Sequence, residues 1–258
     1  MSTAASQSRA DSYERHRREL GNYATRLVLR HSVAEEIVQE AALRLLSEPE
    51  LPDDDAQVRA WLFRVVSNLA IDYLRRHSTW REMALQDTRK KAEADPVFVA
   101  ESVALRGNPE MAAIAREHLA VCLACALRNL PPQQAAALLL REVHGFSTAE
   151  TASTLEVTPI QVKNWIQQAR RVMTDRYAHT CALVTKQGVC YQCVELDDFF
   201  NGQQRDPLAG SARTAAARLS ILRDTREAAL GPWHRRMLML VDDILDPGLS
   251  VEPEESDR

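Results

Sequence analysis

The sequence predicts an all-α protein, and three observations carry that prediction. Ala, Leu, Arg, Glu and Gln dominate the 258 residues, and these residue types favour helix. Glycine occurs only 8 times, and few stretches are rich in the β-branched and aromatic residues typical of strands. Apolar residues recur at the helical spacing of three and four along most of the chain. The hydrophobic share of 45% is enough for the buried cores of two or three small domains.

The charges are unevenly distributed, although the net charge of −4 does not by itself indicate a nucleic-acid-binding protein. Five Arg and one Asp lie between Arg59 and Arg81, and four basic residues and one acid lie between Thr158 and Tyr177. The segment from Asp246 to the last residue holds five acids and one Arg. Basic patches on an acidic chain suit DNA contact at some places and protein contact at others.

The sequence carries no membrane or export signal. No apolar run approaches the roughly 20 residues that a membrane span needs, and the polar N-terminus has no signal-peptide core. We therefore expect a cytoplasmic protein with no membrane span. Five cysteines in such a chain indicate metal or redox chemistry, or no chemistry, before structural disulfides.

The first expected domain comprises residues 12–81, after a disordered N-terminus at residues 1–11. Its helix over 35–46 (EEIVQEAALRLL) carries an apolar stripe opposite its acids, a pattern typical of a helix packed on one side. The stripe consists of Ile37, Val38, Ala41, Ala42 and Leu45.

A break follows at SEPELPDDDAQ, which contains two prolines and three consecutive aspartates. The next helix is expected over 58–76, because apolar residues recur there every four positions with others beside them. These residues are Trp61, Val65, Leu69 and Tyr73, flanked by Leu62, Val66 and Leu74. Residues 82–110 then hold six acids, four basic residues and two prolines, which indicates a linker.

The second expected domain comprises residues 111–177 and contains four helices. The first runs over 111–130 and the second over 133–143, ended at Gly145. Ser147 or Thr148 can cap the third helix, 149–155, with Glu150 supporting its first turn. Thr158 is a good N-cap for the fourth helix, with Pro159 at the first helical position. A helix, a short turn and a basic helix form the helix-turn-helix signature; the alternative is an ordinary helical hairpin.

Three segments in this order resemble sigma factors of the extracytoplasmic-function group, over about residues 12–177. They are EEIVQEAALRLL (35–46), RAWLFRVVSNLAIDYLRR (59–76) and LPPQQAAALLLREVHGFSTAETASTLEVTPIQVKNWIQQARR (130–171). The resemblance implies two helical sigma domains joined by a flexible linker. It also implies core RNA polymerase and promoter DNA as partners, with no enzymatic activity.

The resemblance places the first segment on the clamp helices of the polymerase largest subunit. Glu36, Gln39 and Glu40 share one helix face, so their carboxylates and amide can meet basic residues there. The alternative is an ordinary solvated acidic face.

The second segment is similar to the helix that grips the promoter −10 element. Asn68 falls where the family has a side chain that holds a flipped base, and an amide can both donate to and accept from a base edge. Trp80 is expected either to stack on a base or to belong to the core. Four arginines can neutralise phosphates, and these are Arg64, Arg75, Arg76 and Arg81.

The third segment is similar to the −35-binding domain. The resemblance places four polar side chains in the major groove and two arginines on phosphates. The groove residues are Lys163, Asn164, Gln167 and Gln168, and the phosphate contacts are Arg170 and Arg171. Trp165 and Glu156 depart from the family pattern, which commonly has Arg and a turn Gly at these positions.

Residues 178–258 form a C-terminal extension that we expect to be mostly helical and regulatory. His179, Cys181, Cys190 and Cys193 have spacings that can close a tetrahedral site for one zinc ion. A redox switch, a four-cysteine site that includes Cys122 and Cys125, and purely structural cysteines remain alternatives. Apolar helices after Gly210 are expected to pack on the sigma domains or on a partner, such as an anti-sigma or other regulatory protein.

The sequence therefore predicts a sigma factor that binds core RNA polymerase, recognises −35 and −10 elements and initiates transcription. Its extension is expected to modulate that activity. No zinc-protease motif, phosphate-binding loop or catalytic triad pattern is present, so the chain is not expected to be an enzyme. The alternative is a stand-alone helix-turn-helix regulator with a zinc- or redox-sensing tail.

Overall fold

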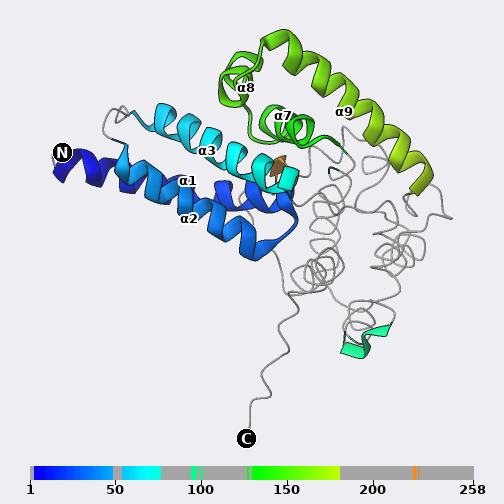
Figure 1. The fold of residues 1–258 in the computed structure, drawn as a ribbon, viewed down its shortest axis with the longest axis horizontal. Coiled ribbons are helices and arrows are strands. Elements are labelled where there is room, and N and C mark those ends of the chain that lie inside the picture. The colour runs from blue at the N-terminus through cyan, green and yellow to red at the C-terminus, as the bar shows by residue number, and fades with distance from the viewer. Residues whose placement is uncertain are drawn as a thin grey trace, which may run out of the picture.

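The computed structural model describes residues 3–48, 54–76, 94–97, 100, 127, 130–180, 223, 224 and 226. Every extended element in these residues is an α-helix, which confirms the predicted fold class. The helices form two groups, called here the first module and the second module (Figure 1). None of the described helices is both long enough and apolar enough to cross a membrane.

The first module consists of α1 (Thr3–Val28), α2 (His31–Ser47) and α3 (Asp55–Arg76), each packed against the other two. The predicted stripe on α2 is confirmed, since Ile37, Ala41 and Leu45 are buried. On α3 the core side differs slightly from the prediction. The column of Trp61, Val65, Leu69 and Tyr73 is only half-buried. The predicted flanking residues Leu62, Val66 and Leu74 are buried, together with Phe63, Ala70 and Ile71, which were not predicted.

The prediction that residues 1–11 are disordered is wrong for residues 3–11, because α1 begins at Thr3. Contacts with the α2–α3 connection hold these early turns. The guanidinium of Arg9 is buried and donates to the carbonyl oxygen of Glu48. One turn later, the hydroxyl of Ser12 donates to Asp55 over 2.6 Å. Partners about forty residues away therefore stabilise a polar segment that has no strong apolar pattern of its own.

The second module consists of α7 (Pro132–Glu142), α8 (Thr148–Leu155) and α9 (Pro159–Thr180). Gly145 adopts a φ of +76° in the turn after α7, a conformation that glycine accepts without steric cost. Ser147 is the N-cap of α8 and forms a reciprocal capping box with Glu150. The hydroxyl oxygen of Thr158 accepts a hydrogen bond from the backbone N–H of Gln161 over 3.2 Å at the start of α9. The predicted helix-turn-helix and its caps are confirmed.

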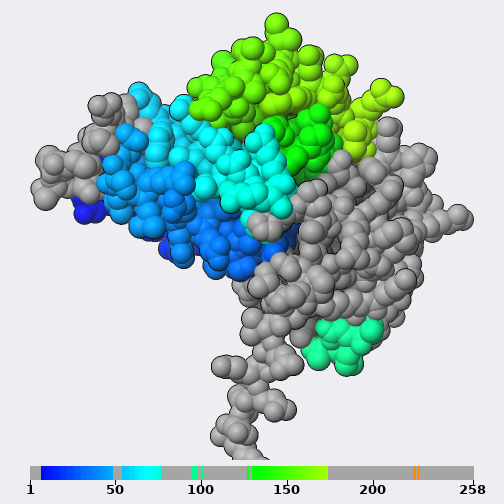
Figure 2. Space-filling model, in the orientation of Figure 1, coloured from blue at the N-terminus to red at the C-terminus, as the bar shows by residue number. Residues whose placement is uncertain are grey.

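The two modules pack against each other. α3 contacts α7 and α8, and α1 contacts α7, so the second module lies along one side of the first without a gap between them (Figure 2). Most of the predicted helix over 111–130, of the linker over 82–110 and of the extension lies outside the described residues. Of that helix, Leu127 and Leu130 are described, and both are buried.

Candidate polymerase and nucleic-acid interfaces

The outer face of α2 combines acidic, amide and apolar side chains. Glu36 and Gln39 are exposed, and Glu40 is half-buried beside Arg44, with which it forms an ion pair of 2.7 Å. Leu43 and Leu46, on the same helix, are 61% and 50% exposed. Exposed leucines beside carboxylates are typical of a protein-binding surface. The sequence analysis missed these two leucines, although both fall outside the buried stripe of α2.

The face of α3 that carries Asn68 is open to solvent. Asn68, Arg75 and Arg76 are exposed, and Arg75 lies 3.5 Å from the carboxylate of Asp72. Arg64, one turn before Asn68, is half-buried, and its Nε is a buried donor without a hydrogen-bond partner within the described residues. The structure therefore places Arg64 and Asn68 one above the other on α3.

The predicted −10 contacts are only partly covered by the structure. Arg81 and Trp80 lie outside the described residues. The remaining four positions all lie on α3, from near its middle to its last residue, and these are Arg64, Asn68, Arg75 and Arg76.

The exposed face of α9 carries the predicted −35 contacts in one row. Lys163, Asn164, Gln167 and Arg171 are all exposed. Lys163, Gln167 and Arg171 recur every four residues and Asn164 lies three residues before Gln167, so they share one helix face. Their amides and amino group are the donors and acceptors that recognise base edges in the major groove.

Two predicted −35 residues make contacts within the second module. The carboxamide of Gln168 accepts from Gln134 on α7 over 2.8 Å. Arg170 forms an ion pair of 2.6 Å with Glu142 at the end of α7. Both side chains therefore form contacts that hold α9 against α7 in this structure.

Ile160 begins the exposed row of α9 and is 71% exposed. An apolar side chain at this place suits contact with the methyl group of thymine, and the sequence analysis missed it. Trp165 lies on another side of α9, half-buried against the core, so packing explains this departure from the family pattern. Glu156 adopts a φ of 56°, the left-handed region that a turn glycine occupies readily.

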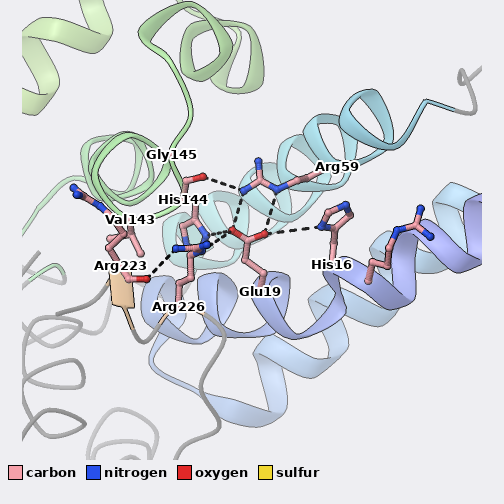
Figure 3. Close-up of a pocket in the computed structure, with 9 residues that line it drawn as sticks. His16, Glu19, Arg59, Val143, His144, Gly145, Arg223 and Arg226 are labelled. Carbon is pink, nitrogen blue, oxygen red and sulfur yellow. Dashed lines mark hydrogen bonds and ion pairs between the residues drawn. The ribbon is translucent and has the colours of Figure 1, made fainter. Parts of the chain in front are cut away.

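A charged network joins the modules and was not predicted (Figure 3). The carboxylate of Glu19 on α1 accepts two hydrogen bonds from Arg59 on α3, at 3.1 and 2.8 Å. It also lies 2.9 Å from Nδ1 of His144 in the second module. Arg59 in turn donates to the backbone carbonyl oxygen of His144 over 3.0 Å. These contacts border a cavity of about 470 Å³ whose lining includes Arg15, His16, Arg223 and Arg226.

The protonation states in this network follow from burial and hydrogen bonding. Burial alone would raise the pKa of Glu19, but hydrogen bonds from His144 and Arg59 outweigh it and lower that pKa to about 2. Burial lowers the pKa of His144 to about 4, against the opposing effect of Glu19. At neutral pH a carboxylate therefore meets a neutral imidazole. Nδ1 must carry the imidazole proton, because the carboxylate can only accept.

The predicted zinc ligands are not tested by the structure. His179 lies in α9 near its end, whereas Cys181, Cys190 and Cys193 lie outside the described residues, as do Cys122 and Cys125. Within the described residues, no group of three or more His, Cys, Asp or Glu side chains is arranged to hold a metal ion.

Two helical modules, the second a helix-turn-helix with an exposed polar row on α9, define the class of DNA-binding transcription proteins. Family models identify the modules further. Sigma-70 region 2 matches residues 12–79, and Sigma-70, region 4 matches residues 120–173. Both matched regions end before the C-terminal extension.

The curated relatives agree with these models. The ECF RNA polymerase sigma factor SigL of Mycobacterium tuberculosis is 31% identical over 165 residues, which cover 62% of this chain and 84% of SigL. SigM of the same organism is 32% identical over 159 residues, covering 61% of this chain and 71% of SigM. The chain belongs to the ECF sigma factors, which are non-enzymatic initiation factors that recognise promoters for RNA polymerase. The match to region 2 disfavours a stand-alone helix-turn-helix regulator.

Proposed function

We propose that this sigma factor divides its task among three exposed helix faces. α2 binds core RNA polymerase, α3 captures an unpaired base of the −10 element, and α9 reads the −35 element in the major groove. We further propose that it does so in the cytoplasm, where its polymerase and promoters are. The observation that carries this proposal is the exposed polar row on α9, in a chain whose first module matches sigma region 2.

Polymerase binding is proposed for the face of α2 that holds Glu36, Gln39 and Glu40. These side chains are exposed or half-buried and lie on the same helix as the exposed Leu43 and Leu46. An apolar patch bordered by carboxylates provides buried area together with charge complementarity to a basic partner.

Charge reversal tests this docking surface. The variant with Glu36→Lys and Glu40→Lys should bind core polymerase at least ten-fold more weakly than the unmodified chain, because two attractive contacts become repulsive. A matched control carries Asp11→Lys and Glu14→Lys on α1, where both acids are exposed. Equal core affinity for both double variants would show that α2 does not dock on the polymerase.

Promoter opening is proposed to depend on Asn68. A base that leaves the stack costs a few kcal/mol in lost stacking and pairing. The Asn68 amide is exposed on α3 and can donate to and accept from the edge of such a base. Arg75 and Arg76 follow on the same helix and can neutralise the adjacent phosphates.

We also propose that the C-terminal extension modulates promoter binding and holds one zinc ion through His179, Cys181, Cys190 and Cys193. Three thiolates and one imidazole are the ligands of a closed structural zinc site. Elemental analysis of protein purified under reducing conditions should find one equivalent of zinc, lost in the Cys190→Ser, Cys193→Ser variant. Metal-free protein that forms a Cys190–Cys193 disulfide on mild oxidation would support a redox switch instead. An extension of this kind can also bind an anti-sigma or other regulatory protein.

A further inference from the structure

The contact between the two modules has the character of a protein core. The ring of His144, in the turn after α7, is fully buried, and its centroid lies 5.2 Å from that of Tyr23 and 5.1 Å from that of Phe63. Phe146, in the same turn, packs on Phe63 with ring centroids 5.0 Å apart. The guanidinium of Arg59 lies over both phenylalanine rings. The turn of residues 143–146 thus inserts its aromatic side chains between α1 and α3.

Buried charge makes this contact specific. The side chain of Glu19 is only 7% exposed, and a carboxylate in such a place needs hydrogen-bond donors around it. Arg59 and His144 supply them from both modules. Separation of the modules would expose the aromatic rings and remove one of the donors that hold Glu19.

Residues from the C-terminal extension reinforce the same contact from outside. The backbone oxygen of Arg226 accepts from the side chain of Asn22 on α1 over 2.7 Å, and its guanidinium lies 3.9 Å from Glu19. Arg223 donates to the backbone oxygen of Glu142, the last residue of α7, over 2.8 Å. Cations favour the C-terminal end of a helix, where carbonyl oxygens lack partners. One short segment of the extension therefore binds α1 of the first module and α7 of the second (Figure 3).

We propose that Arg223 and Arg226 act as a clasp that holds the two modules in a closed form unable to engage a promoter. The proposal rests on the proposed function for its biological meaning. Elements centred at −35 and −10 are about 25 base pairs apart, which is about 85 Å along the DNA. α3 and α9 have 22 residues each, so each is about 33 Å long, and both pack against α8.

The closed form cannot place both recognition faces on their elements at once. Asn68 lies in the second half of α3, and the row from Ile160 to Arg171 lies within the first 13 residues of α9, the helix that follows and contacts α8. Their separation is therefore a few tens of ångströms, well short of the DNA spacing. The turn of residues 143–146 has to leave the first module before promoter binding, and the clasp opposes that step.

The test measures the distance between the modules in the full-length chain without polymerase. Fluorophores are attached through non-natural amino acids at Arg17 on α1 and Ser153 on α8, both exposed, and energy transfer reports the closed fraction. The double variant Arg223→Glu, Arg226→Glu should raise the ratio of open to closed form about five-fold or more. The variant Asn22→Leu should raise it in the same direction, because it removes the contact to the Arg226 backbone. Arg18→Glu, an exposed charge reversal on α1, should leave the ratio unchanged.

The clasp proposal is contradicted if the double variant and Asn22→Leu both show the same energy transfer as the unmodified chain. It is equally overturned if the unmodified chain is open to begin with. Binding of a duplex carrying the −35 element by the free chain supplies the functional readout, and the double variant should bind it more tightly. Failure of every form to bind core polymerase would contradict the proposed function and leave the distance measurement intact.

Discussion

Arg59 on α3 and Glu19 on α1 form a two-point ion pair, with Nε and Nη2 of the guanidinium donating to the two carboxylate oxygens at 3.1 and 2.8 Å. The planar guanidinium matches the carboxylate in this geometry. Because Arg59 also donates to the backbone oxygen of His144, one side chain links α1, α3 and the turn after α7. This residue thus connects the fold of the first module to the placement of the second.

Arg59→Ala should lower the free energy of unfolding of the full chain by about 2–3 kcal/mol, because it leaves a mostly buried carboxylate with fewer donors. Urea denaturation followed by circular dichroism measures the change. Arg59→Lys should recover part of the loss, since a lysine keeps the charge but not the two-point geometry. The control Arg18→Ala should change stability by no more than about 0.5 kcal/mol. A loss in Arg59→Ala no larger than in this control would contradict the assigned role.

The closed form should become weaker as the solution is acidified. The pKa of His144 is lowered to about 4 in the closed form from its ordinary value of 6.5, so the open form binds more protons between these two values. The contribution of neutral His144 to the stability of the closed form is therefore fully present above pH 6.5 and is lost as pH falls toward 4. Glu19, with its pKa lowered to about 2, acts in the same direction only at lower pH. The guanidinium groups of Arg59, Arg26 and Arg226 face the same network.

Energy transfer between the modules, recorded from about pH 7.5 to about pH 5.5, measures this dependence. The closed fraction of the unmodified chain should decline over the acidic part of this range. His144→Gln cannot titrate and should give a nearly flat profile. An unmodified chain whose closed fraction rises on acidification would show that the sign is wrong.

Glu156→Gly should stabilise the second module by about 1 kcal/mol, because a side chain in the left-handed region carries a steric cost that glycine lacks. Glu156 is exposed and is the C-cap of α8 with a φ of 56°. Thermal unfolding measures the gain. As a comparison, Ser153→Gly in the body of α8 should destabilise it by roughly 0.5–1 kcal/mol. Destabilisation in both variants would contradict the interpretation of the turn.

Substitutions in the exposed row of α9 should weaken −35 binding. Ile160→Ala, Lys163→Ala and Gln167→Ala should each cost about 1–3 kcal/mol if the side chain contacts a base. Ile160→Ala should act only on sequences that present a thymine methyl at the contacted position. Gel-shift assays on a duplex set with single base changes make this comparison, with Ser153→Ala on α8 as the control. An equal loss on every duplex would assign these side chains to the DNA backbone instead.

Local chemistry made much of the second module predictable. The capping box of Ser147 with Glu150, and Thr158 followed by Pro159, each mark the start of a helix through residues no more than four positions apart in sequence. The structure has a helix start at both places. The all-α class followed likewise from composition and periodicity. The row on α9 came from the family resemblance, and helical spacing fixed its shared face.

The junction between the modules was beyond sequence reasoning for a physical reason. Glu19 and Arg59 are 40 residues apart, and Glu19 and His144 are 125 residues apart. Single charged residues on helices look like solvated surface positions until tertiary packing brings them together. The same reason explains the wrong prediction of disorder at residues 3–11, where the contact of Arg9 to Glu48 is equally distant in sequence.

Permanganate footprinting of promoter DNA tests the central claim most directly, because it detects the unpaired thymines that a sigma factor produces with core RNA polymerase. Addition of this chain to core polymerase should make thymines around the −10 element reactive. The Asn68→Ala variant should retain closed-complex binding but show markedly less reactivity, since its proposed partner is an unpaired base. No reactivity on any fragment of a genomic promoter library, with core polymerase that is active with another sigma factor, would contradict the account.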